Sequence, residues 1–213
     1  MDGVTLASRN AHKARELEVL LPGWHIAPLD VDDYPEETGS TYYENALIKA
    51  RFAHGRFGGW TIGEDSGIEV AALGGRPGVH SARYAREAAR VVGQAADTRP
   101  EDRVASGDPG GAPAIARLLE ELRNVDDRRA RYVSELVAIA PDGEELRGTG
   151  ILEGTIAEHP RGSGGFGYDP VFVPEGTHLT VGELGDAWKR EHSHRARAVR
   201  ALRKAFERRL DGA

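Results

Sequence analysis

The amino-acid sequence predicts an α/β protein, because strand-like and helix-like segments alternate along the chain. The short apolar segment Val4–Ala7 is typical of a buried strand and leads through a polar turn into a helix over 11–21. A second helix, over 40–58, leads directly into a further strand at Trp60–Ile62. With 213 residues, the chain can form one α/β domain or two lobes that share a sheet.

The first two helices are predicted from their ends. Asn10 can cap the first helix, and Pro22 stops it. Thr41 and Glu44 have the spacing of a capping box, in which each side chain binds the backbone N–H of the other residue. Gly58 ends the second helix.

The later elements follow an irregular segment. Residues 86–112, rich in Ala, Arg, Asp, Gly and Pro, are expected to form an exposed excursion. A helix over 114–122 follows, and then strands at Tyr132–Ile139 and Ile151–Ile156, which we expect to pair as an antiparallel hairpin. The last helix should begin near Ser193. Its apolar stripe consists of Val199, Leu202, Phe206 and Leu210.

Composition narrows the function classes. A net charge of −6 disfavours non-specific binding to nucleic acid, which depends on Lys and Arg neutralising phosphates. The chain has no cysteine, so disulfides, thiolate metal sites and a cysteine nucleophile are excluded. The sequence has no signal-peptide pattern and no apolar run near the roughly 18 residues of a membrane span. We therefore expect a cytoplasmic protein that binds neither nucleic acid nor membranes.

The segment Gly162–Pro170 is the most distinctive part of the sequence. Its glycines let the backbone adopt positive φ and approach a ligand closely. Phe166 and Tyr168 could then stack on a flat ring, with Asp169 beside them. The alternative is a flexible loop whose two aromatic side chains cap the core.

The segment Ser8–Lys13 lies where the first strand becomes a helix. Free backbone N–H groups and the helix dipole would favour an anion there, and Lys13 would add a full positive charge. The segment lacks the glycine pattern of a P-loop. The alternative is a capped helix with a solvated lysine.

Two pairs of acidic residues are candidate magnesium ligands. Glu64 and Asp65 come after the strand at Trp60–Ile62, where a loop could present them to a cleft, and Glu36-Glu37 form another acidic turn. Mg²⁺ prefers such oxygen ligands and commonly bridges them to substrate phosphates. Ordinary solvated acidic turns are the alternative.

Four basic residues are further candidates for the functional site. Lys49 lies in the second helix, and Lys189, His194 and Arg195 gather at the start of the last helix. Positive charge at a helix N-terminus opposes the dipole, which hints at a ligand there. Isolated surface lysines usually have no such role.

Taken together, these segments resemble the inosine triphosphate pyrophosphatase family, and the resemblance spans nearly the whole chain. It implies an elongated α/β fold with a mixed β-sheet flanked by helices, two lobes with a nucleotide-binding cleft between them, and a homodimer. The whole chain, 1–213, would then be a single domain of two lobes. The segments that carry the resemblance are Leu6–Leu21, Glu36–Ala50, Glu64–Val70, Gly74–Ala85, Gly162–Gly176 and Lys189–Ala198.

The resemblance implies Mg²⁺-dependent hydrolysis of ITP, dITP and XTP to the monophosphate and pyrophosphate. Asp65 would be the base and a metal ligand, Glu37 and Glu64 further ligands, and Lys13 and Lys49 catalytic cations that hold phosphates. The implied substrate-binding residues are Ser8, Arg9, Asn10, Ala11, His12, Lys13, Ser66, Phe166, Gly167, Tyr168, Asp169, Lys189, His194 and Arg195.

The resemblance also implies how the base is selected. Residues 166–169, Lys189, His194 and Arg195 would aim donors at the 6-oxo group of hypoxanthine or xanthine. Adenine carries a 6-amino donor instead, so ATP would leave buried donors unpaired.

Two features depart from the family pattern. The family usually has two aspartates before Ser-Gly, and here the first is Glu64, so we expect retained activity with any effect confined to metal geometry. The segment Arg86–Pro113 is longer than the usual connection and could alter the rim of the cleft or the dimer surface.

Three rival functions remain. A pyrophosphatase for modified pyrimidine nucleotides would share the fold, but the loop at 162–170 argues against it. A nucleotide-binding protein without catalysis is supported by Glu64 alone. An RNA-binding module is disfavoured by the acidic balance.

Overall fold

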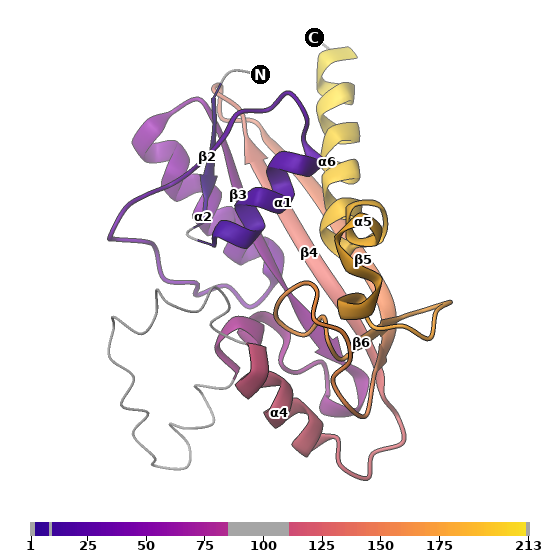
Figure 1. Ribbon diagram of the computed structural model, residues 1–213. Helices are drawn as coiled ribbons and strands as arrows, with labels where there is room; N and C mark the ends of the chain where they lie inside the picture. The colour runs from indigo at the N-terminus through magenta and orange to yellow at the C-terminus, as the bar shows by residue number, and fades with distance from the viewer. Residues whose placement is uncertain (1–2, 9, 85–110, 212–213) are drawn as a thin grey trace. The chain divides into compact units, whose positions relative to one another are not determined.

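The computed structural model describes residues 3–8, 10–84 and 111–211 (Figure 1). The chain forms two compact units, of which the first comprises Met1–Ser66, Val133–Ile151 and Arg190–Ala213 and the second Gly67–Tyr132 and Leu152–Lys189. Because the chain passes repeatedly between the units, each is built from segments far apart in sequence. A single domain of two lobes stays a prediction.

The strands form one mixed sheet in the order β2-β1-β3-β4-β5-β6, with helices packed against it, which confirms the predicted α/β fold. β1 pairs in parallel with β2 and β3, whereas β5 and β6 are antiparallel. The strands are β1 (Val4–Ala7), β2 (Ile26–Pro28), β3 (Trp60–Val70), β4 (Arg129–Ile139), β5 (Glu145–Ile156) and β6 (Phe172–Pro174).

The described helices connect or follow these strands. They are α1 (Ala11–Leu20), α2 (Tyr42–Phe57), α4 (Gly111–Glu121), α5 (Val181–His192) and α6 (His194–Asp211), with short 3-10 turns η1 (Ala71–Leu73) and η2 (Gly78–Arg83). No described helix combines the length and the apolar character that crossing a membrane requires.

In the first unit, helices cover both faces of the sheet. Leu136 and Ala138 of β4 pack in one cluster with α1 and α6, whereas their neighbours Val137 and Ile139 pack against α2. Successive side chains of a strand point to opposite faces, so α1 and α6 lie on one face and α2 lies on the other (Figure 1).

Glycines bring two of these helices close to the sheet. A Cβ atom at Gly63 of β3 would overlap the backbone of α2 at Ala46, and one at Gly150 of β5 would overlap the first residue of α6. Any larger residue would push the helices outward. The two glycines therefore set the depth at which side chains of α2 and α6 meet the sheet.

The second unit has its own core. Leu118 and Leu122, from α4 and the residues just after it, pack with Tyr132 of β4 and Phe172 of β6. The aromatic rings of Tyr132 and Phe172 lie with centroids 4.5 Å apart.

Several predicted boundaries hold and others shift. Asn10 caps α1, and Thr41 and Glu44 form the predicted capping box of α2. β4 and β5 are neighbours joined through a short turn, closed by the bond from Ala140 N–H to the Glu144 carbonyl, as expected of the hairpin. Helix α4 begins at Gly111 rather than at residue 114, because Pro113 is tolerated in a first turn.

Other predictions were incomplete. The short strands β2 and β6 and the helix α5 were not predicted, and α5 is interrupted by Gly185 at φ 76°. Phe206 packs on the core of the first unit, but Leu210 is 63% exposed, so the buried stripe of α6 ends before it. The predicted excursion at 86–112 lies almost wholly outside the described residues.

Candidate active site

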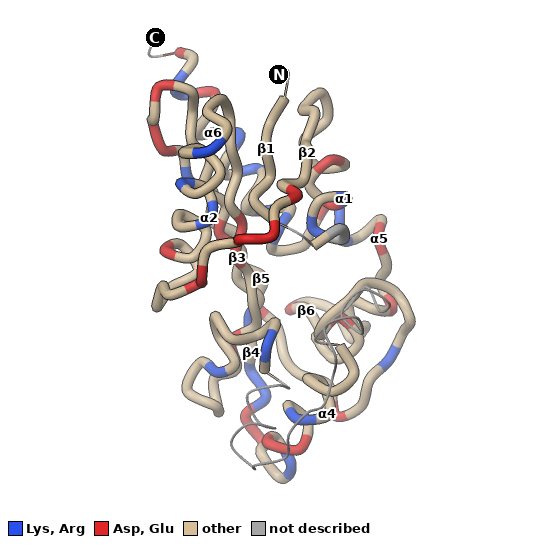
Figure 2. The backbone as a smooth tube through the Cα atoms, turned by 90° about the vertical axis from the view of Figure 1, so that its left-hand side faces the viewer, with Lys and Arg blue, Asp and Glu red and all other residues tan. Residues whose placement is uncertain are grey.

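Glu64 and Asp65 lie inside the central strand β3, so the predicted loop at a strand end was wrong. β3 has hydrogen-bonded neighbours on both sides, and its pairing outweighs the weak strand preference of acidic residues. Both acids are almost fully buried, at 1% and 6% exposure. As adjacent residues of a strand they point to opposite faces of the sheet. Figure 2 shows several red stretches along the segment between β2 and α2, which contains Glu37.

Asp65 lies on the face covered by α2. Lys49 Nζ is 3.4 Å from Asp65 Oδ1 and 2.7 Å from Glu37 Oε1, so one ammonium group joins two carboxylates. Asn45 Nδ2 donates to Asp65 Oδ2 at 3.2 Å, while Asn45 Oδ1 accepts from the backbone N–H of Gly39 at 2.8 Å. The second bond fixes the orientation of the Asn45 amide.

Asn45 is a site residue that was not predicted. It precedes Lys49 by four positions and therefore lies on the same face of α2, where it is fully buried. A polar residue one turn from a candidate lysine was the available sequence signal.

The electrostatics on the α2 face of the sheet favour a role for Asp65 as a general base. Burial raises the pKa of Asp65, and the attraction of Lys49 only partly offsets it. Burial lowers the pKa of Lys49, but Asp65 and Glu37 outweigh that effect, so its pKa is raised. A carboxylate with raised pKa next to a fixed ammonium group can take up a proton more readily than an ordinary aspartate.

Glu64 lies on the opposite face, against α1 and α6. Lys13 Nζ is 2.6 Å from Glu64 Oε2, and Arg195 Nη2 is 3.2 Å from Glu64 Oε1. The Ser134 hydroxyl donates to the same Oε1 at 3.3 Å. Burial raises the pKa of Glu64, but Lys13 and Arg195 more than reverse this, so its pKa lies well below the usual range. Glu64 therefore stays ionised.

Arg195, on the same face as Glu64, joins several polar side chains. Its guanidinium is 2% exposed and contacts Glu64, Glu16 and the Ser66 hydroxyl. Burial lowers the pKa of Arg195, but the two carboxylates outweigh it and the pKa is raised. A positive charge at the start of α6 is unfavourable to the helix dipole, and the carboxylates of Glu64 and Glu16 offset it. His194, the first residue of α6, is also buried.

The strand-to-helix turn before Lys13 is built as expected of a capped helix. The backbone N–H of Asn10 donates to Ser8 Oγ at 3.1 Å, and that of Lys13 donates to Asn10 Oδ1 at 3.3 Å. Lys13 itself pairs with Glu64, so it is not a solvated lysine. Arg9 and the side chains of Ala11 and His12 lie outside the described part of the chain.

In the second unit, Lys189 belongs to α5 and not to the last helix, as had been expected. Its ammonium group is 2.9 Å from Asp169 Oδ2 and 4.5 Å from the centroid of the Phe166 ring. Lys189 and Asp169 are both almost fully buried. The structure thus brings together three residues of the predicted ring-binding set.

Tyr168 has a different environment from Phe166. Its side chain is 5% exposed within the core of the second unit, and its hydroxyl donates to the Ser81 carbonyl at 3.0 Å. For Tyr168 the alternative of an aromatic side chain that caps the core is therefore correct. Phe166 is only half-buried.

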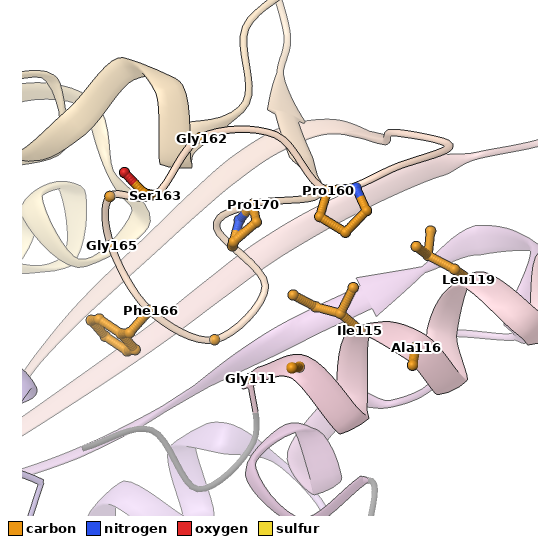
Figure 3. Close-up of a pocket in the computed structure, with 13 residues that line it drawn as sticks. Gly111, Ile115, Ala116, Leu119, Pro160, Gly162, Ser163, Gly165, Phe166 and Pro170 are labelled. Atoms are coloured by element: carbon orange, nitrogen blue, oxygen red, sulfur yellow. The ribbon is translucent and has the colours of Figure 1, made fainter. Parts of the chain in front are cut away.

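A cavity of about 470 Å³ opens on the glycine loop (Figure 3). Ile115 and Leu119 of α4 line one side, and Phe166 and Pro170 of the loop line the other. Its volume is in the range of small-molecule pockets.

The described residues, with 1–2, 9, 85–110 and 212–213 set aside, contain no group of three His, Asp or Glu side chains that could hold a metal by itself. Glu37 and Asp65 nevertheless form a pair around Lys49. Two carboxylates suit Mg²⁺, which keeps several waters and takes further oxygens from phosphate.

The mixed sheet defines an α/β protein, and buried carboxylates whose pKa values are shifted in opposite directions, each paired with a lysine, are typical of an enzyme's active site. The chain belongs to the Ham1 family, whose model matches residues 4–205. The resemblance deduced from the motifs is thereby confirmed.

Relatives cover nearly the whole chain. A dITP/XTP pyrophosphatase of Deinococcus radiodurans is 43% identical over 201 residues, which span 93% of this chain and 90% of the relative. The solved structure of the Staphylococcus aureus Ham1 protein is 33% identical, with a TM-score of 0.78 and coverage of 98% and 100% of the two chains. That of a nucleoside-triphosphatase, dITP/XTP pyrophosphatase from Mycobacterium abscessus, is 36% identical with a TM-score of 0.69, covering 95% and 98%.

Proposed function

We propose that this protein hydrolyses dITP, XTP and ITP to the nucleoside monophosphate and pyrophosphate, and so removes deaminated purines from the nucleotide pool. Membership of the Ham1 family and the names of its relatives support the reaction. The observation that carries the proposal is the Asp65 carboxylate, buried, raised in pKa, and held between Lys49 and Asn45.

Asp65 acts as the general base. A water molecule attacks the α-phosphorus of the nucleotide and gives its proton to Asp65, and the bond from the α-phosphorus to the bridging oxygen breaks. Pyrophosphate leaves with the bonding electron pair. Lys13 and Lys49 hold phosphate oxygens, and the positive end of the α1 dipole adds to their attraction for the phosphates.

Glu37 and Asp65 would hold Mg²⁺, whereas Glu64, expected from the sequence as a further ligand, points to the opposite face of the sheet. Bound there, the ion would neutralise charge on the phosphate oxygens. The contacts of Glu64 with Lys13 and Arg195 favour a further role, in which Glu64 keeps Lys13 extended toward the phosphates.

We assign base recognition to residues 166–169 and Lys189. His194 and Arg195, which the resemblance also implied, lie in the first unit, where Arg195 is buried against Glu64 and Glu16. The Lys189 ammonium and the half-buried Phe166 ring offer a donor and a stacking surface for a 6-oxo purine. Adenine would face that donor with its own 6-amino donor, and buried mispairing of this kind is worth on the order of 10⁴-fold in discrimination.

The test is pyrophosphate release from ITP, XTP, dITP, GTP and ATP side by side at alkaline pH, with Mg²⁺ and with chelator. We expect rapid release from the first three, little from GTP and ATP, and loss of activity on removal of the metal. Release of inorganic phosphate as the first product, or equal rates for all five nucleotides, would contradict the proposal.

We further propose that the protein is a homodimer acting in the cytoplasm, where nucleoside triphosphates are made and used. Sedimentation equilibrium of the purified chain and fractionation of the source cells test these two points. A concentration-independent monomer or recovery with membranes would contradict them.

A further inference from the structure

The carboxylate of Asp169 is a junction in the second unit. Its Oδ2 accepts from the backbone N–H of Phe166 and from Lys189 Nζ, both at 2.9 Å. Its Oδ1 accepts from the hydroxyl of Tyr132 at 3.2 Å. The carboxylate is thus held by a loop amide, a helix lysine and a strand tyrosine.

The glycine loop is closed tightly around this junction. Gly165 has φ 75°, and a Cβ atom there would overlap the Asp169 carboxylate. The Asp169 carbonyl accepts from Gly182 N–H at 2.9 Å, which ties the loop to the first turn of α5. One side chain therefore sets the position of both the Phe166 backbone and the Lys189 ammonium.

Tyr132 is rigidly placed to orient that side chain. It lies in β4, is 6% exposed, and its ring packs on Phe172. Its hydroxyl therefore has little freedom to move, and the bond fixes the rotation of the Asp169 carboxylate. A hydrogen bond to a charged acceptor is among the stronger ones in proteins.

We propose that Tyr132 is a positioning residue for base recognition and acts through Asp169 on Phe166 and Lys189. This inference rests on the proposed function, in which the loop and Lys189 read a 6-oxo purine. Because base contacts stabilise the bound substrate and the transition state alike, their loss should raise KM and leave kcat nearly unchanged.

The test compares Tyr132→Phe with Tyr84→Phe. Tyr84 is a buried tyrosine of the same core, so the control removes the same atom elsewhere. We expect Y132F to raise KM for dITP about tenfold with kcat within about twofold, and Y84F to change neither by more than about twofold. For ATP, kcat/KM should stay unchanged, so discrimination falls about tenfold.

A double-mutant cycle with Asp169→Asn tests the route. If Tyr132 acts through Asp169, adding Y132F to D169N should change KM less than about twofold. A further tenfold loss in the D169N background would overturn the inference.

Hydrogen exchange of the Phe166 amide gives a readout that does not depend on turnover. The exchange rate should rise in Y132F and not in Y84F. If Y132F matches Y84F in KM and in exchange while the wild type is active, this inference fails and the proposed function stands. A wild type that releases no pyrophosphate from dITP contradicts the proposed function itself.

Discussion

Glu64 and Asp65 are neighbours in one strand, yet the two faces of the sheet give them opposite properties. Glu64 meets Lys13 and Arg195 and has a pKa well below the usual range, whereas Asp65 has a raised pKa although it contacts Lys49. Two carboxyl groups whose environments push their pKa values apart commonly divide the work of a site. Glu64 is suited to a permanent charge that anchors cations, and Asp65 to proton transfer.

The difference comes from how many cations each carboxylate shares. Glu64 is paired with two cations, Lys13 and Arg195, the second of which also contacts Glu16. Asp65 shares the single ammonium of Lys49 with Glu37, and the repulsion of Glu37 and Glu64 adds to burial in raising its pKa. The number of cations on each face therefore distinguishes the two roles: a carboxylate with two cations stays ionised, and one that shares a single cation can act as a base.

The largest effect is expected from Asp65→Asn, which removes the base and keeps the shape. Turnover of dITP should fall by about 10²–10⁴-fold, the usual contribution of general base catalysis, while nucleotide binding persists. Pyrophosphate release and equilibrium binding measure the two quantities. The control Asp142→Asn changes an exposed aspartate and should leave turnover intact. Retained turnover in D65N would remove Asp65 from the mechanism.

Glu64→Gln should act mainly on stability, because it leaves Arg195 buried beside a neutral group. Breaking a buried ion pair costs about 3–5 kcal/mol in free energy of unfolding. Since the folded pKa of Glu64 is depressed, its contribution is present above the ordinary value of 4.5 and is lost as pH falls below it. Urea unfolding at pH 7 and at acid pH should therefore show the variant's deficit shrinking at low pH.

Glu158→Gln, at an exposed glutamate, is the matched control for that experiment and should change stability by less than about 0.5 kcal/mol. A deficit of E64Q that grows toward acid pH would contradict the anchoring role.

Asn45→Ala tests what sets the pKa of Asp65 on its face of the sheet. The Asn45 amide donates to the ionised carboxylate, so its loss should raise the pKa of Asp65 further. The acid limb of the pH profile of kcat/KM, already above the ordinary value of 3.8, should move to higher pH. The rate at neutral pH should fall about tenfold. A limb that moves to lower pH would show that another group titrates.

The smallest effect is expected from Glu64→Asp, which draws the carboxylate back by about one bond length. An anchor between long, flexible cations should tolerate this, with a cost of about 1 kcal/mol in stability and turnover within about threefold. Thermal unfolding and initial rates measure both. A loss of turnover as large as that of D65N would indicate that Glu64 takes part in the chemistry directly.

Local signals in the sequence predicted the helix starts well. Asn10, Thr41 and Glu44 cap their helices because capping depends on residues only a few positions apart. The hairpin of β4 and β5 was predictable for the same reason, since a short turn joins its strands.

Features that depend on distant partners were not predictable. Glu64 and Asp65 were predicted to lie in a loop because acidic residues have a weak strand preference. Their strand is stabilised by neighbouring strands and by cations from α1, α2 and α6, which the local sequence does not reveal. Asn45 was missed because its meaning depends on Asp65, twenty positions away. Lys189 was assigned to the wrong helix because the irregular Gly185 hides the pattern of α5.

The central claim, that Asp65 and Glu64 have opposite roles, is tested most directly by following the side-chain carboxyl carbons of both residues by NMR as the pH is varied. D65N and E64Q identify the two signals. The account predicts that Asp65 titrates above 3.8 and that Glu64 stays ionised well below 4.5. The reverse order, with Glu64 taking up its proton first as the pH falls, would contradict it.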